Sequence, residues 1–184
     1  MFKSFYGMTF NSFDKSLLES YAFKSKDHEQ MLSRLEYLKN ARGIGLFTAP
    51  PGSGKTFTLR CFSKSLNPNL YQLSYICLST VSVTEFYQQF CHEALKQRIV
   101  VHYNCEGLSV EEAKNYIYSR IELTGAARSI IDESAVHAVA NFCQGTPRII
   151  NSVMTNALIL GSQLKKNSID SEVILSACNS LSLS

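Results

Sequence analysis

The stretch APPGSGKT at residues 49–56 decides how the rest of the chain is interpreted. Gly52 and Gly54 allow the backbone to turn with its N–H groups pointing inward, so that they can cradle phosphate oxygens. A helix that starts directly after the loop would present its positive end to the same anion. Lys55 would then reach the outer phosphates of a nucleoside triphosphate, and the Thr56 hydroxyl would bind Mg²⁺. The loop therefore predicts a site for a polyphosphate and a magnesium ion.

The same stretch fits the Walker A pattern, with Ala49 in place of the usual first glycine. An apolar run at residues 44–49 predicts a buried strand before the loop, and residues 55–66 predict a helix that is stopped by Asn67 and Pro68. A chance turn rich in Gly and Pro is the alternative, and the flanking strand and helix argue against it. We expect ATP and Mg²⁺ to be held by Pro51, Gly52, Ser53, Gly54, Lys55, Thr56 and Phe57, with Thr56 as the metal ligand.

Outward from the loop, the chain divides into three parts. Residues 1–27 are aromatic and irregular, and Tyr21 and Phe23 within them could pack on a nucleotide base or simply join the core. Residues 28–105 alternate helix and strand patterns, whereas residues 106–184 contain helix patterns only. We therefore predict an N-terminal aromatic segment, an α/β core and a helical C-terminal part.

Local start and stop signals place the individual elements. Besides the helix at residues 55–66, in the core we expect helices at residues 28–40, with Asp27 as N-cap, and at residues 83–97, and strands at residues 70–78 and 98–103. In the C-terminal part we expect helices that start at Ser109, Asp132, Thr146 and Asp170.

Three further stretches resemble one family, the AAA+ ATPases. Residues 145–151 (GTPRIIN) look like its sensor-2 motif, in which an arginine on a lid helix reaches back to the γ-phosphate. Stretches between residues 97 and 113 resemble the passage from the last core strand into that lid. Residues 6–13 (YGMTFNSF) resemble the N-terminal segment of a subgroup that includes the general-secretion-pathway ATPase and the ATP-binding helper proteins of bacterial transposons. Ser12 stands where that subgroup usually has proline.

The resemblance implies an α/β P-loop NTPase (AAA+) core with a helical lid, which binds ATP and Mg²⁺. It implies that Arg148 is the sensor-2 arginine; the alternative is a salt-bridged helix arginine. It also implies that Arg98 is an arginine finger acting on a neighbouring subunit's nucleotide; the alternative is a surface arginine. Lys55, Arg148 and Arg98 are therefore the predicted catalytic residues. The partners that it implies are further copies of the chain, a transposase and DNA.

A Walker B strand, which in this family ends in an Asp-Glu pair, is not evident in the sequence. Residues 57–97 number 41 positions, whereas one βαβ unit alone takes roughly 30 or more, so two further strands and their helices do not fit. Residues 83–91 resemble the family's helix after the second strand, and residues 92–98 resemble its segment before the last strand. We therefore expect the join between the retained parts near Cys91 and His92. Asp132 and Glu133 open a helical pattern and follow only two apolar residues, so we interpret Asp132 as an N-cap. We expect a truncated core with a reduced sheet of about three mainly parallel strands.

Composition limits the remaining possibilities. The 184 residues are 45% hydrophobic and 18% charged, which excludes a disordered chain, and the net charge of +3 excludes a highly basic nucleoprotein. The six cysteines form no CxxC pair, so we expect reduced thiols rather than a zinc site or disulfides. No signal peptide or membrane span is evident, so we expect a cytoplasmic protein.

These observations favour an ATP-binding AAA+ protein, a transposition-associated helper whose hydrolysis is impaired by the loss of the Walker B acids. A secretion-pathway-type ATPase is one alternative, and the lack of an evident membrane span in the sequence favours transposition over it. A non-enzymatic truncated remnant with weak or no nucleotide binding is the other. Family analogy and the adjacent Lys165 and Lys166 also raise DNA binding by the helical part.

Overall fold

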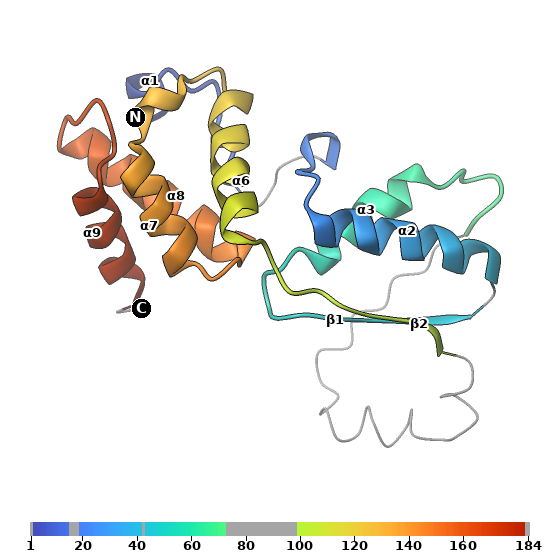
Figure 1. Cartoon of the computed structure of the whole chain (residues 1–184). Helices are drawn as coiled ribbons and strands as arrows, with labels where there is room; N and C mark the ends of the chain where they lie inside the picture. The colour runs from blue at the N-terminus through green and yellow to red at the C-terminus, as the bar shows by residue number, and fades with distance from the viewer. Residues whose placement is uncertain (1, 15–18, 42, 73–98, 183–184) are drawn as a thin grey trace.

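The computed structural model of the chain describes residues 2–14, 19–41, 43–72 and 99–182. Within these ranges the α/β core contains two parallel strands, β1 (Ile44–Thr48) and β2 (Ile99–Asn104), which pair directly. Helices α2 (Lys26–Ala41) and α3 (Lys55–Ser65) contact each other and lie on one face of the sheet (Figure 1). The Thr48 hydroxyl donates to Asn104 Oδ1 at 2.9 Å, which joins the strands at their carboxyl ends. The phosphate loop and the connection to the helical part both leave from this edge.

The helical part, which we call the lid, follows β2 and contains α6 (Val110–Leu123), the 3-10 turn η2 (Arg128–Ile130), α7 (Glu133–Phe142), α8 (Pro147–Gln163) and α9 (Ser171–Ser182). Its helices pack around one apolar cluster. The largest fully buried side chains among the described residues all belong to it, including Ile117, Ile150, Met154 and Leu158. The lid therefore contains most of the described core. Burying one such side chain stabilises the fold by about 1.5–3 kcal/mol.

The N-terminal segment packs on the lid rather than on the sheet. It contains α1 (Phe2–Phe5), with Tyr6, Met8 and Phe13 buried in the lid cluster, and ends in the 3-10 turn η1 (Glu19–Tyr21). The Tyr6 hydroxyl donates to the Lys166 carbonyl at 3.1 Å. Thr9 donates its N–H and its hydroxyl to the Thr124 carbonyl. The chain therefore starts on the lid and crosses to the core through α2.

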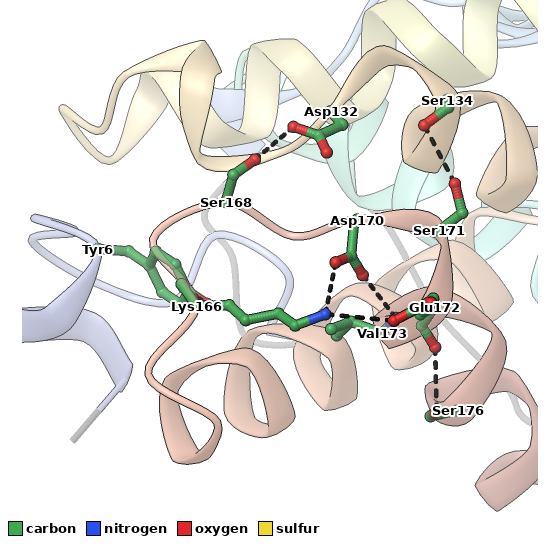
Figure 2. A network of polar contacts seen from close by, with 10 residues as sticks. All are labelled: Tyr6, Asp132, Ser134, Lys166, Ser168, Asp170, Ser171, Glu172, Val173 and Ser176. Carbon is green, nitrogen blue, oxygen red and sulfur yellow. Dashed lines mark hydrogen bonds and ion pairs between the residues drawn. The ribbon is translucent and has the colours of Figure 1, made fainter.

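A polar network fixes the turn between α8 and α9 against the start of α7 (Figure 2). The Ser168 hydroxyl donates to the Asp132 carboxylate, and Ser171 and Ser134 share a hydrogen bond of 3.0 Å. Lys166 forms an ion pair with Asp170, which also accepts from the Val173 N–H at the start of α9. This network belongs to the lid's own packing.

Most predicted helices are confirmed, and one predicted cap is wrong. Asp132 is the N-cap residue of α7, and Ser109 caps α6 through a full capping box with Glu112. Asp27, however, lies inside the first turn of α2, because the Ser25 hydroxyl accepts from the His28 N–H and caps that helix instead. The Asp27 carboxylate is used in contacts with β2 and the lid, described below.

Part of the prediction falls on residues that the structure does not describe. These are the helix at residues 83–97, Arg98, and the strand at residues 70–78 from position 73 onward; Leu70 itself lies in a turn. Cys61, Cys105 and Cys143 are free thiols. In the described ranges, no helix has both the length and the apolar composition needed to cross a bilayer.

Candidate nucleotide-binding site

The phosphate loop has the backbone that its glycines predict. Gly52 and Gly54 adopt φ angles of +90° and +98°, a region that residues with a Cβ rarely enter. Gly54 is the N-cap residue of α3, and no side chain among the described residues caps this helix end. The first amides of α3 are therefore left for another acceptor, which is the arrangement that binds phosphate.

Two polar groups of the loop fit an anion as the missing partner. Lys55 Nζ donates to the carbonyls of Ala49 at 2.7 Å and Pro50 at 3.1 Å, so the ammonium lies folded against its own loop. The Ser53 hydroxyl is buried and has no hydrogen-bond partner among the residues that the structure describes. Buried polar atoms without partners are rare in folded proteins. A polyphosphate would supply acceptors for both residues, and the exposed Thr56 hydroxyl stands at the helix start where Mg²⁺ would bind.

The loop forms one end of a cavity of about 870 Å³. Its walls come from the loop and α3, from α2, from the N-terminal segment and from lid helices α6 and α8. Ligand pockets typically measure ~300–1,000 Å³, so the space is sufficient for a nucleoside triphosphate. Residues 51–57, the predicted cofactor-binding residues, all line it.

Arg148 reaches the loop from the lid. It lies in the first turn of α8, and its backbone N–H donates to the Gly52 carbonyl at 3.4 Å. A Cβ placed on Gly52 would lie 2.8 Å from Arg148 Cβ and 3.2 Å from the Thr146 methyl group. The structure thus brings Lys55 and Arg148, which are distant in sequence, to the walls of one cavity. Their catalytic roles stay predictions, and Arg98 lies outside the described residues.

The cavity also contains residues that the sequence motifs did not indicate. His28 from α2 shares a 2.9 Å hydrogen bond between its Nδ1 and the hydroxyl of buried Thr58, and burial lowers the pKa of the imidazole. Arg120 and Tyr116 line it from α6. No local spacing marks these residues, because they reach the cavity only through the packing of α2 and the lid.

The two aromatic residues considered for base packing behave differently. Phe23 lines the cavity and packs edge-on against the Tyr116 ring, with centroids 5.4 Å apart. Tyr21 stacks on Phe10 at 6.1 Å and is not part of the cavity wall. Only Phe23 is therefore placed where a base could reach it.

A parallel sheet, a glycine-rich phosphate loop at its carboxyl edge and a helical part that covers the loop define a P-loop NTPase fold. A family model described as an AAA domain matches residues 38–182, and the chain belongs to this family. Members of this class of P-loop ATPase generally bind a nucleotide together with Mg²⁺. No curated protein matches the chain significantly.

Solved structures of RuvB from Thermotoga maritima, described as a Holliday junction branch migration motor, share the fold. One has a TM-score of 0.59 at 19% identity, covering 92% of this chain and 73% of that chain. A point variant of that protein gives a TM-score of 0.58 at 17% identity, with coverage of 94% and 74%. At this identity the similarity concerns the fold.

Proposed function

We propose that this protein binds Mg-ATP between its phosphate loop and its lid and acts as a nucleotide-dependent switch with little hydrolysis. The observation that carries the proposal is the contact between Arg148 and Gly52 above the loop of residues 51–57. A lid cation that lines the same cavity as Lys55 supports the proposal. A triphosphate bound there would touch both parts of the molecule, so binding would favour one arrangement of lid and core.

In this proposal, different residues bind the phosphates and the metal ion. The loop amides and Lys55 hold the outer phosphates, and the Thr56 hydroxyl binds the metal. Arg148 neutralises charge on the γ-phosphate from the lid side. When bound, Mg²⁺ would bridge phosphate oxygens and reduce their negative charge.

The expectation of weak hydrolysis rests on the sequence, which has no evident Walker B acid pair. Asp132 and Glu133, the pair that most resembles one, stand at the start of α7, where Asp132 accepts from Ser168. Neither residue lines the cavity. A positioned acid or base typically contributes ~10²–10⁴ in rate, so turnover without one should lie near background.

For the finer class we propose a transposition-associated helper that assembles with further copies of itself and contacts a transposase and DNA. The resemblance of residues 6–13 to the helper subgroup supports it, and the RuvB motor shows that this fold serves a DNA-directed protein elsewhere. A secretion-pathway-type ATPase and a truncated remnant without strong nucleotide binding are the alternatives. DNA binding is tested by a gel shift, in which affinity should fall steeply with salt.

The main experiment measures Mg-ATP binding by calorimetry and by the shift in melting temperature. At 100 times Kd, binding should add ~2.7 kcal/mol to stability. Lys55→Ala should abolish the shift. Lys64→Ala is the matched control, because Lys64 is on the same helix but pairs with Glu19 at 2.7 Å, away from the loop.

The outcomes separate the alternatives. No shift for the wild type at saturating Mg-ATP would favour the remnant. Robust hydrolysis that Lys55→Ala abolishes would refute the proposed switch in favour of an active ATPase. A shift without turnover is the expected result.

A further inference from the structure

A carboxylate of the lid caps a helix of the core. Glu112, in the first turn of α6, accepts from the Lys26 N–H at 2.7 Å through Oε1 and from the Ser109 N–H at 3.0 Å through Oε2. Lys26 is the first residue of α2, so its amide has no acceptor within that helix. The positive end of the helix dipole also favours a negative charge there. One side chain therefore completes the start of both helices.

A second carboxylate makes the reverse connection, from the core to the lid. Asp27, next to Lys26 on α2, accepts at 2.8 Å from the N–H of Gly107, in the segment that leads from β2 into α6. One such bond alone would leave α6 free to turn about it. The two bonds together fix the direction of α6 relative to α2. The other lid helices follow α6, because they pack with it around one apolar cluster.

The two connections differ in how easily they break. The bond between Asp27 and Gly107 is partly buried, and the Tyr103 hydroxyl holds the same carboxylate at 2.6 Å. The bond between Lys26 and Glu112 is exposed to solvent. Water replaces an exposed hydrogen bond at small cost, so such bonds open first in local fluctuations. The bond to Glu112 is therefore the one that can be released, while the bond to Asp27 remains as a pivot.

Release of this bond would change the cavity that contains the phosphate loop. The walls of the cavity belong to both parts, with the loop and α2 from the core and α6 and α8 from the lid. The two parts also touch at Gly52, whose carbonyl accepts from the Arg148 N–H at 3.4 Å. When α6 turns away from α2, α8 moves with it, because both helices bury residues in the same cluster. The contact at Gly52 would then separate, and the cavity would widen.

We propose that Glu112 is a latch between lid and core: its bond to the Lys26 amide keeps the lid closed over the phosphate loop, and its release lets the nucleotide enter and leave. The inference rests on the proposed function, since it assumes that Mg-ATP binds at Lys55. Glu112 is not part of the cavity wall, so it is a positioning residue that controls the rate of nucleotide exchange.

The test removes the donor of the latch and leaves the lid unchanged. Proline is favoured at the first position of a helix, where the amide hydrogen that it lacks is not used by the helix. Lys26→Pro therefore deletes the N–H that bonds to Glu112, whereas Lys26→Ala, the matched control, keeps it. Ser25 precedes this position as the N-cap residue, and the extended backbone typical of an N-cap is the one favoured before proline.

Nucleotide release is followed by stopped-flow fluorescence. The probe is the magnesium complex of methylanthraniloyl-ATP, displaced by excess Mg-ATP. Lys26→Pro should release the probe about threefold to tenfold faster than the wild type, since one hydrogen bond changes an equilibrium by about this factor. Lys26→Ala should release it at the wild-type rate. Equal rates in the two Lys26 variants would overturn the latch.

A second pair of variants acts from the lid side and decides the question if Lys26→Pro does not fold. Glu112→Ala removes the acceptor together with half of the capping box, whereas Ser109→Ala removes the other half and keeps the latch bond. Glu112→Ala should release the probe faster than Ser109→Ala, and equal rates would refute the latch. Adding Lys26→Pro to Glu112→Ala should give no further increase, because both changes delete the same bond. A further increase would contradict the proposal.

Hydrogen exchange tests the latch without any nucleotide. The Arg148 amide, bonded to the Gly52 carbonyl, reports whether the lid is closed on the loop. It should exchange about threefold or more faster in Lys26→Pro than in Lys26→Ala, while the amides of α7 inside the lid keep their protection. Unchanged exchange at Arg148 would show that the bond to Glu112 has a purely structural role, and the latch would be refuted.

The outcomes distinguish this inference from the proposed function. If the wild type binds the probe and the two Lys26 variants release it at the same rate, the latch is refuted while the nucleotide site stands. If the wild type does not bind the probe, the proposed function is refuted, and control of exchange by Glu112 is refuted with it.

Discussion

Gly52 and Gly54 both have a positive φ angle in the phosphate loop, but their surroundings differ. A Cβ on Gly52 would lie 2.8 Å from Arg148 Cβ, whereas a Cβ on Gly54 would meet nothing within 4 Å. Both alanine variants carry the strain of a positive φ, about 1–2 kcal/mol. Gly52→Ala must in addition push the lid away from the loop. We therefore expect it to lower the free energy of unfolding further, by about 1 kcal/mol or more. Urea unfolding of both variants checks this, and equal losses would contradict the observed lid contact.

His28 provides a pH-dependent prediction. Burial beside Thr58 lowers the pKa of its imidazole from the usual 6.5, so the unfolded chain takes up this proton at a higher pH than the folded chain. Stability from this group is therefore complete above pH 6.5 and is lost as the pH falls below that value. Between pH 7 and pH 5 the wild type should lose more unfolding free energy than His28→Gln. Urea titrations at several pH values measure it, and parallel curves for the two proteins would contradict the assignment.

Single residues also show where the sequence was informative about the site. Lys55 and Thr56 belong to a local motif whose backbone is fixed by its own glycines, so their place could be predicted. Arg148 was found through its resemblance to a lid motif. No sequence motif marks Arg120 or His28. The sequence pattern of an amphipathic helix does not show whether an arginine or histidine on it faces solvent or a cavity.

Helix α6 begins with a capping box, and the contribution of this capping box to stability can be tested. The Ser109 hydroxyl accepts from the Glu112 N–H at 3.2 Å, and the Glu112 carboxylate accepts from the Ser109 N–H at 3.0 Å. Ser109→Ala should lower the free energy of unfolding by about 1 kcal/mol. Ser119→Ala is the control, because Ser119 is on the same helix and bonds only to the Tyr116 carbonyl one turn earlier. Thermal or urea unfolding measures the stability of both variants. Equal stability of Ser109→Ala and Ser119→Ala would contradict the predicted role of the cap.

The predicted elements were correct where local chemistry determines them. Capping residues and apolar spacing located α6, α7 and α8 closely, because a helix end must satisfy its own amides. The start of α2 was misplaced, because Ser25 and Asp27 are both good caps and tertiary contacts decided between them. The packing of Tyr6 and Phe13 into the lid is a long-range contact, which spacing alone does not reveal.

At the scale of the whole molecule, the segment that leads from β2 into the lid, residues 105–109, makes a close backbone contact with the segment before α8. We call residues 105–109 the lid passage. Leu108 N–H donates to the Gly145 carbonyl at 2.8 Å, and a Cβ on Gly145 would lie 2.2 Å from the Leu108 carbonyl oxygen. Gly107 adopts a φ angle of +92° at the same place. The start of α6 and the start of α8 therefore meet with no room for side chains. This contact holds the start of α8, which carries Arg148, against the segment that leaves β2.

Asp27 connects this passage to the core, so it offers a test of how the two parts are held together. Its carboxylate accepts from the Tyr103 hydroxyl at 2.6 Å and from the Gly107 N–H at 2.8 Å, which ties α2 to β2 and to the lid passage. Burial and this bond raise the pKa of the Tyr103 phenol, so the bond persists throughout the neutral range. Asp27→Ala should cost about 2–3 kcal/mol, because it removes both bonds and leaves their donors unpaired, whereas Tyr103→Phe should cost about 1 kcal/mol.

Unfolding free energies give only the overall loss of stability in each variant. Hydrogen exchange shows which amides lose protection. The Gly107 amide should be protected in the wild type and in Tyr103→Phe, because its bond to Asp27 survives in both. In Asp27→Ala the same amide should exchange rapidly, while the amides of α7 in the lid interior keep their protection. Equal protection of Gly107 in all three proteins would mean that Asp27 stabilises α2 alone. A selective loss at Gly107 means that one carboxylate of the core holds the lid passage, and through it the position of Arg148 above the loop.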